Sequence, residues 1–423
     1  MSTIFHRIVS RSCGYCEDEA AHRPATSALV MLLAIAIGAL PFAAVSREVT
    51  VIRLDGTPIS ASQIDATVIR SMQEARVPGI GIAIFNHGNI VYARTYGVRD
   101  GTSSKPLTPD SVMTAASLTK VAFAVMVVQL VEEEILDLDR PVVEYLPKPL
   151  PEYALYRDLA SDRRYEQITL RMLLDHTSGL PNWRRFTDEK ALGIYFRPGS
   201  RFAYSGEGIA LAQMVVETVT GKSIEALMRE RIFQPLGMTR TSMVWEPQFE
   251  RDYANAYDEE GISLGPQRRR RGDAAGSMQT TLRDYARFVK AVMGRELLDD
   301  KWTAAMFSPQ IRITSAYEFP TLAAETTTAN DSIRLSYGLG WGLYWSPYGK
   351  AFFKEGHDGG WQHYVVCFTQ PGTGILIMTN SSNGENVYGP LLETLIRNTF
   401  TPYEWEGFKR PAASAKQRAR PRG

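Results

Sequence analysis

The sequence predicts an α+β fold, in which an antiparallel β-sheet flanked by helices is assembled from both ends of the chain around a helical insertion domain. Strand-like runs joined by tight turns occur at 80–97 and return, rich in glycine and aromatic residues, at 337–380. The residues between them carry helix caps, helical spacing and Gly or Pro stops. A chain of 423 residues is long enough for one large domain or two interleaved ones.

Composition divides the body of the chain into two lobes. We expect residues 50–146 and 272–403 to form an α/β lobe, and residues 147–271 to form a mostly helical lobe. The boundary falls at the proline-rich stretch from Pro147 to Pro151. A cleft between two such lobes is the expected place of a functional site.

Residues 1–46 form an N-terminal segment that predicts export. Thirteen apolar or small residues run from Ala28 to Leu40, and Pro41 and Ala44-Val45-Ser46 follow as a helix breaker and a signal-peptide cleavage context. An uncleaved membrane anchor is the alternative, because 24–46 is long enough to span a bilayer. In both cases the body of the protein is expected to be periplasmic or extracellular.

The remaining composition excludes several classes of partner. The formal net charge is +1, so no overall field favours nucleic acid. Cys13-x-x-Cys16 precedes the export segment and is interpreted as a chance pair rather than a metal or redox site, so no metal and no cofactor is predicted. Only Cys367 lies in the exported body, which leaves no internal disulfide there. Residues 409–423, with six Lys or Arg, are typical of a disordered tail.

Ser117 and Lys120 are the first candidates for chemistry. They begin an apolar stretch with no Pro or Gly before Pro141, which predicts a buried helix. Residues three apart share a helix face, so the Ser117 hydroxyl and the Lys120 ammonium can meet. A desolvated lysine can take the proton of a serine hydroxyl, and the helix N-terminus offers free N–H groups to an oxyanion. A chance Ser-x-x-Lys match is the alternative, since such short motifs are common.

Three motifs occur in the order Ser117-x-x-Lys120, Tyr204-Ser205-Gly206 and His357-Asp358-Gly359, flanked by 176–181 and 234–238. With them the chain resembles the superfamily of serine β-lactamases and penicillin-binding proteins over roughly residues 55–400. It is most similar to the class C-like branch, which includes D-aminopeptidases and family VIII esterases.

The resemblance implies a role for each motif residue. Ser117 would be the acylated nucleophile and Lys120 its proton-relay partner, while Tyr204 would take and return protons with help from the cations Lys120 and His357. The backbone N–H groups of Ser117 and Gly360 would form the oxyanion hole, and one such donor is worth about 3–4 kcal/mol. The alternatives are a buried loop anchor for Tyr204 and a turn residue for His357.

Two departures from the family pattern bear on the substrate. Gly206 stands where the second motif has an Asn, and His357 with Asp358 replaces the Lys and hydroxyl residue of the third motif. Asp358 and Gly359 are expected to contact substrate, and Asp358 would repel a substrate carboxylate. An esterase or D-amino-peptidase is therefore expected rather than an efficient β-lactamase.

The sequence thus predicts an exported serine hydrolase that acts through a Ser117 acyl-enzyme on an ester, amide or β-lactam bond of a small acyl substrate. The alternative is a penicillin-binding or sensor protein that acylates slowly without turnover. His176, at a helix end, is interpreted as a structural hydrogen-bonding residue. The four arginines 268–271 are interpreted as a solvated surface loop rather than an anion site. The oligomeric state is left open.

Overall fold

A computed structural model describes residues 49–408, and its centre is a nine-stranded sheet in which every neighbouring pair is antiparallel. The strand order is β10-β11-β12-β13-β14-β15-β3-β4-β5. The strands span β3 (Gly79–Asn86), β4 (Asn89–Asp100), β5 (Lys105–Pro106), β10 (Ile311–Arg312), β11 (Ser336–Tyr337), β12 (Gly342–Ser346), β13 (Gly349–Asp358), β14 (Trp361–Phe368) and β15 (Thr373–Thr379). Because β15 pairs with β3, the two ends of the chain join in one sheet, and the predicted α+β class is confirmed.

Three two-stranded pairs lie outside the large sheet. They are β1 (Thr50–Ile52) with β2 (Pro58–Ser60), β6 (Met113–Thr114) with β9 (Gln279–Thr280), and β7 (Ala256–Tyr257) with β8 (Ser263–Gly265). The β6–β9 pair immediately precedes the Ser117 turn, so it fixes where that turn lies.

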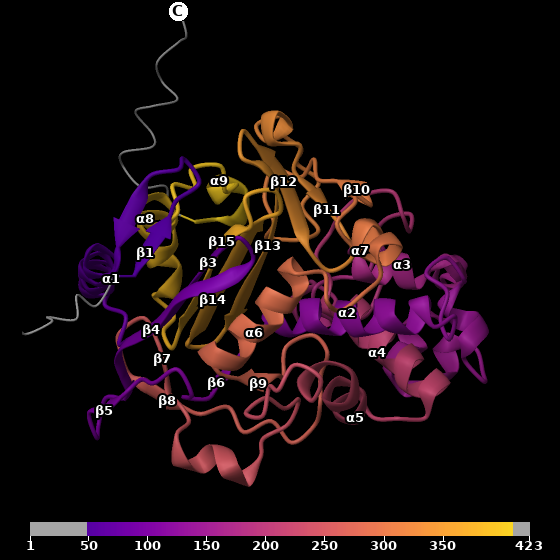
Figure 1. Ribbon diagram of the computed structural model, residues 1–423. Helices are drawn as coiled ribbons and strands as arrows, with labels where there is room; N and C mark the ends of the chain where they lie inside the picture. The colour runs from indigo at the N-terminus through magenta and orange to yellow at the C-terminus, as the bar shows by residue number, and fades with distance from the viewer. Residues whose placement is uncertain (1–48, 409–423) are drawn as a thin grey trace, which may run out of the picture. The chain divides into compact units, whose positions relative to one another are not determined.

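Helices cover both faces of the sheet (Figure 1). One face packs on α1 (Ala61–Ala75), α8 (Tyr388–Leu395) and α9 (Tyr403–Glu406). The other packs on a larger core built with α2 (Leu118–Glu132), α3 (Leu170–Leu174), α4 (Gly206–Thr220), α5 (Ile224–Met228), α6 (Leu282–Met293) and α7 (Asp300–Met306). Short 3-10 turns complete the chain at Val142–Tyr145, Leu150–Glu152, Ala154–Leu159, Arg163–Gln167, Arg184–Phe186, Pro247–Arg251, Asp331–Ile333 and Gly384–Val387, with a π-helical turn at Arg229–Phe233.

The helix caps explain most of the helix boundaries. Ser60 and Gln63 form a capping box that starts α1, and Ser205 accepts the N–H of Gly208 to start α4. The helix α2 is buried along nearly its whole length, in agreement with its unbroken apolar sequence. No helix of residues 49–408 is long and apolar enough to cross a membrane. The predicted export segment and the basic tail both lie outside the described residues.

Candidate active site

Ser117 and Lys120 meet at the start of α2. Ser117 is the N-cap residue of the helix rather than a member of its first turn, and Ala116 before it has a left-handed φ of 48°. The Lys120 ammonium lies 2.9 Å from the Ser117 hydroxyl oxygen and also donates to the carbonyl of Ala275 at 2.5 Å. Only 2% of Lys120 is exposed. The predicted contact over one helical turn is therefore present in a water-poor environment.

A free backbone donor lies beside the Ser117 hydroxyl. The N–H groups of Leu118, Thr119 and Lys120 each donate to the carbonyl of the residue three positions earlier in the chain. Among the hydrogen bonds of the described residues, the N–H of Ser117 donates none. It is available to a developing oxyanion, and it sits at the positive end of α2.

Tyr204 lies against both Lys120 and a second lysine, Lys354. The two ammonium nitrogens are 5.0 Å and 4.5 Å from the centre of the Tyr204 ring. Tyr204 is 3% exposed, and its hydroxyl has no hydrogen-bond partner within the described part of the chain. A buried phenol without a partner is costly, which is typical of a group reserved for a reaction.

The side chain that β13 contributes to this cluster is that of Lys354 and not that of His357. Lys354 and Gly356 share one face of β13, and a side chain at Gly356 would approach the N atom of Leu118 to 3.2 Å. His357 follows Gly356 directly, so its ring points to the opposite face, where it packs 5.7 Å from the ring of Phe408 and is exposed. The expected place of His357 at the nucleophile is therefore corrected.

The sequence contains a signal for Lys354. Lys354-Glu355-Gly356 is itself a Lys-x-Gly tripeptide, three residues before His357-Asp358-Gly359. An offset of three residues reverses the side-chain face of a strand. The position of the β13–β14 turn, which closes with the pair Asp358 and Trp361, decides between the two motifs.

Gly360 does not lie at the nucleophile either. Its N–H donates to the hydroxyl of Ser382 at 3.2 Å, and a Cβ on it would meet Ala256 at 2.5 Å. With a φ of 73°, Gly360 is a turn residue between β13 and β14. The expectation of Gly360 in the oxyanion hole is therefore corrected.

The free edge of β13 offers another donor. Strand β12 pairs with β13 only as far as Phe353, so no strand of residues 49–408 covers the edge from 354 to 358. The closing pair of a two-residue hairpin is hydrogen-bonded, and hydrogen-bonded and open pairs alternate from there. The backbone N–H of His357 then points to the open edge, beside Gly356 and the start of α2.

Asp358 and Gly359 lie at the hairpin tip, and no hydrogen bond or ion pair among residues 49–408 joins them to Ser117 or Lys120. The Asp358 carboxylate pairs with Arg269 at 2.9 Å, and Gly359 is exposed with open space around it. Arg269 belongs to the four-arginine run that was interpreted as a surface loop. Because Asp358 is neutralised by Arg269, its charge acts only weakly on the site.

Two buried carboxylic acids set the charge of Lys354. Burial alone would lower the pKa of the Lys354 ammonium, yet its ion pair with Glu355 raises that pKa well above the ordinary value. Burial and the nearby Glu355 raise the pKa of Glu318 well above its usual range. Lys354 is therefore a fixed cation, and none of it is exposed.

The neighbours of Tyr204 explain the unusual Gly206 and the role of His176. A Cβ on Gly206 would lie 2.6 Å from the indole ring of Trp183, so that ring occupies the space of the usual Asn side chain. His176 is buried, accepts the N–H of Ser205 and packs 4.4 Å from the Tyr204 ring. Burial lowers the pKa of His176 well below its usual value, so the ring is neutral and supports the structural interpretation.

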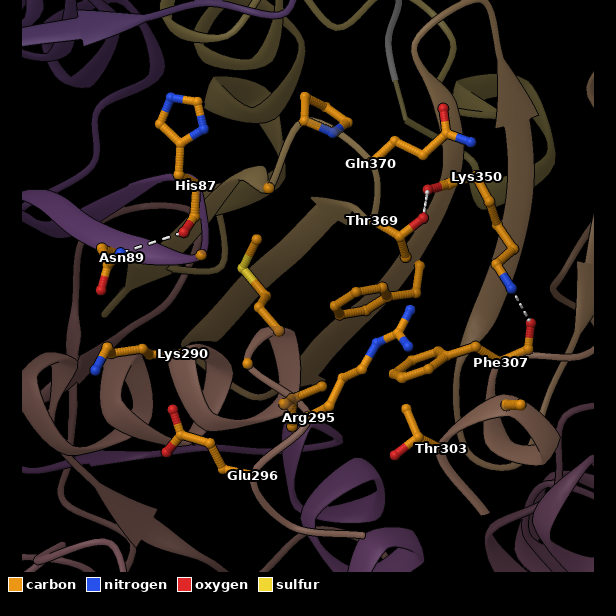
Figure 2. A pocket seen from close by; sticks show the side chains of 18 of the residues that line it. His87, Asn89, Lys290, Arg295, Glu296, Thr303, Phe307, Lys350, Thr369 and Gln370 are labelled. Atoms are coloured by element: carbon orange, nitrogen blue, oxygen red, sulfur yellow. Dashed lines mark hydrogen bonds between the residues drawn. The ribbon is translucent and has the colours of Figure 1, made fainter. Parts of the chain in front are cut away.

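No group of three or more His, Cys, Asp or Glu in residues 49–408 is arranged to hold a metal ion. A separate cavity of about 820 Å³ lies between the β3–β4 and β14–β15 turns, the start of β13, and the segments that contain the end of α6 and α7 (Figure 2). His87, Lys290, Arg295 and Lys350 line it, and none of Ser117, Lys120 and Tyr204 does. The site around Ser117 is therefore independent of this basic cavity.

A family model described as Beta-lactamase matches residues 64–397. The chain belongs to the β-lactamase family. The family resemblance predicted from the three motifs is thereby confirmed, and the protein is a β-lactamase-family hydrolase.

Its relatives differ in the activities that their names state. Esterase EstB of Burkholderia gladioli is 30% identical over 221 residues, which are 46% of this chain and 54% of that protein. Penicillin-binding protein 4 of Amycolatopsis lactamdurans is 26% identical over 347 residues, covering 76% of this chain and 86% of the relative. The β-lactamase of Yersinia enterocolitica is 24% identical over 305 residues, covering 68% of this chain and 70% of the relative.

A solved structure, that of the octameric penicillin-binding protein homologue from Pyrococcus abyssi, shares the fold. The two structures superpose with a TM-score of 0.64 at 23% sequence identity. The match covers 82% of this chain and 80% of the Pyrococcus abyssi chain.

Proposed function

We propose that this protein is an exported serine hydrolase that cleaves neutral esters or amides through an acyl-enzyme on Ser117. The observation that carries the proposal is the buried contact between the Ser117 hydroxyl and the Lys120 ammonium beside the unpartnered hydroxyl of Tyr204. A nucleophile, a proton-accepting group and a second proton carrier are the parts that acyl transfer needs.

The first half of the reaction forms the acyl-enzyme. The Ser117 hydroxyl oxygen attacks the substrate carbonyl carbon while its proton passes to the Lys120 amine or the Tyr204 oxygen. The N–H of Ser117 and the edge N–H of His357 hold the oxyanion. The bond from carbonyl carbon to leaving group then breaks, and the departing oxygen or nitrogen takes the proton.

The second half releases the acid. A water molecule attacks the acyl carbon and gives its proton to the same base. The bond to the Ser117 oxygen then breaks, and that oxygen takes the proton back from the base. Lys354 contributes a fixed positive charge 4.5 Å from the Tyr204 ring, which stabilises negative charge that develops on the Tyr204 oxygen during proton transfer.

The charges of the site favour a neutral substrate. Lys354 is the cation nearest the third motif, but it is fully buried and paired with Glu355, so a substrate carboxylate cannot reach it. The exposed Asp358 is already paired with Arg269. Lys354 and Arg269 are both paired with carboxylates of the protein, so neither is an unpaired cation that could bind the carboxylate of a penicillin. The esterase among the relatives supports the same preference for neutral substrates.

The test measures kcat/KM for p-nitrophenyl butanoate and for nitrocefin with the wild type and with Ser117→Ala. The ester is expected to be the better substrate, and Ser117→Ala is expected to abolish turnover of both while leaving the melting temperature unchanged. A single burst of product without steady turnover favours the slowly acylating penicillin-binding or sensor protein. Full activity in Ser117→Ala contradicts both functions.

A further inference from the structure

An apolar pocket lies against Tyr204 and Gly206 of the second motif. It encloses about 240 Å³ and is lined mainly by Pro181, Trp183, Phe186, Phe319, Pro320 and Leu322. Phe186 is 69% exposed and Phe319 is 44% exposed, which is unusual for side chains of this size. Exposed aromatic rings that face a common hollow mark a surface that binds an apolar ligand.

Two contacts connect this pocket with the catalytic cluster. The Phe319 ring packs edge to face on the Tyr204 ring, with centroids 5.6 Å apart. Trp183 packs directly on Gly206, and the adjacent Asn182 side chain accepts the Gly206 N–H at 3.2 Å. A substrate group that enters the pocket therefore lies beside the second motif, next to the residues that handle protons.

Buried or bidentate polar contacts hold both walls in place. Arg184, between Trp183 and Phe186 in sequence, binds the carboxylate of Glu207 with two side-chain nitrogens, at 2.9 Å and 2.8 Å. Only 7% of Glu207 is exposed, and it lies in the first turn of α4. On the opposite wall, the Arg201 guanidinium donates to the carbonyls of Leu322 and Ala323. The pocket is thus formed before a ligand arrives.

The other flank of the site is polar. It consists of the β13–β14 hairpin tip with the Asp358–Arg269 ion pair. An apolar chain would stay exposed to water and charged groups there, whereas Trp183, Phe186 and Phe319 offer it ring surfaces that exclude water. The acyl chain stays attached to Ser117 through both halves of the reaction, so a rigid pocket beside Ser117 can act in both, while a leaving group has to depart to solvent.

We infer that this pocket receives the acyl chain of the substrate, and that the protein prefers medium-chain acyl esters to acetyl esters. The inference rests on the proposed function and names the substrate class of the same site. Each buried methylene contributes enough to raise kcat/KM by about fourfold until the pocket is full.

The experiment compares p-nitrophenyl alkylphosphonates with methyl to octyl chains, which label a nucleophilic serine without requiring turnover. The rate of labelling of Ser117 is expected to rise with chain length. In Phe186→Ala the slope is expected to flatten, and in Thr321→Trp, which fills the pocket, the gain is expected to end at shorter chains. Ile262→Ala is the matched control, because Ile262 is 62% exposed and does not line the pocket.

The outcomes separate the two proposals. Labelling of Ser117 that is independent of chain length, or that falls equally in Phe186→Ala and Ile262→Ala, overturns the acyl pocket and leaves the proposed function intact. Absence of any labelling at Ser117 overturns the proposed function itself. In a parallel series of acetate esters with longer alcohols, a gain with alcohol length and none with acyl length contradicts the assignment to the acyl chain.

Discussion

Two buried lysines flank Tyr204, and they differ in what their ammonium groups contact. Lys120 bonds only to uncharged oxygens, the Ser117 hydroxyl and the Ala275 carbonyl, and no ion pair of the described residues includes it. Lys354 is paired with the carboxylate of Glu355. Lys120 contacts the Ser117 hydroxyl directly, whereas Lys354 lies over the Tyr204 ring and is held by a carboxylate. The proposed function uses this contrast: Lys120 transfers protons and Lys354 supplies a fixed charge.

Replacing Lys120 is expected to have the largest effect on activity. In Lys120→Met, kcat for a neutral ester should fall about 10³-fold, because a positioned proton acceptor is lost. Lys350→Met is the matched control: the Lys350 ammonium also donates to a backbone carbonyl, at 2.7 Å, but it lies in the separate basic cavity (Figure 2). If Lys120→Met keeps more than a tenth of the activity, Lys120 is not the base.

Replacing Lys354 is expected to have the largest effect on stability. Lys354→Met leaves Glu355 buried without its partner, which should cost about 3–5 kcal/mol in urea unfolding. The double variant Lys354→Met with Glu355→Gln should recover most of that loss, because neither charge then remains. Equal losses in the single and double variants would show that the ion pair does not hold this region.

Asp175 extends the comparison to an acid without a cation partner. Burial raises the pKa of Asp175 to about 7, and its closest partners are the N–H and hydroxyl of Thr177. The folded protein therefore binds a proton that the unfolded chain has lost above about pH 4. Stability should fall as pH rises from about 4 to 7, by up to about 1.4 kcal/mol per pH unit.

Asp175→Asn removes this titration and can keep the Thr177 hydrogen bonds. Its free energy of unfolding should exceed that of the wild type by a margin that grows between pH 5 and pH 7. Parallel pH profiles of the two proteins would contradict the raised pKa.

The smallest effect is expected at the hairpin tip. Asp358→Asn should change the ratio of ester to nitrocefin hydrolysis less than about threefold, because Asp358 is exposed and already paired with Arg269. A change of more than tenfold in kcat/KM would place this carboxylate in contact with substrate.

Sequence reasoning succeeded where the geometry is local. The Ser117–Lys120 contact depends only on helical spacing, and the loop that enters a helix near Ser205 also follows from local sequence. Tyr204 was assigned to the site by the family resemblance. The α+β class also followed from the strand patterns at the two ends of the chain. These features need no knowledge of which distant segments pack together.

The third motif failed for a non-local reason. The face of each β13 side chain is set by its pairing with β14 and its approach to α2, so Lys354 and His357 could not be ranked from composition alone. The replacement of the usual Asn by Gly206 likewise depends on Trp183, which is distant in sequence. The two-lobe division and the catalytic roles remain predictions.

The most direct test of the account is the mass of the covalent intermediate. The enzyme is mixed with p-nitrophenyl hexanoate, quenched in acid within milliseconds to seconds, and digested for mass spectrometry. We expect the hexanoyl mass on the peptide that contains Ser117, and we expect it to be lost in Ser117→Ala and to form slowly in Lys120→Met. Rapid hydrolysis with no acyl adduct, or an adduct on another residue, would contradict the account.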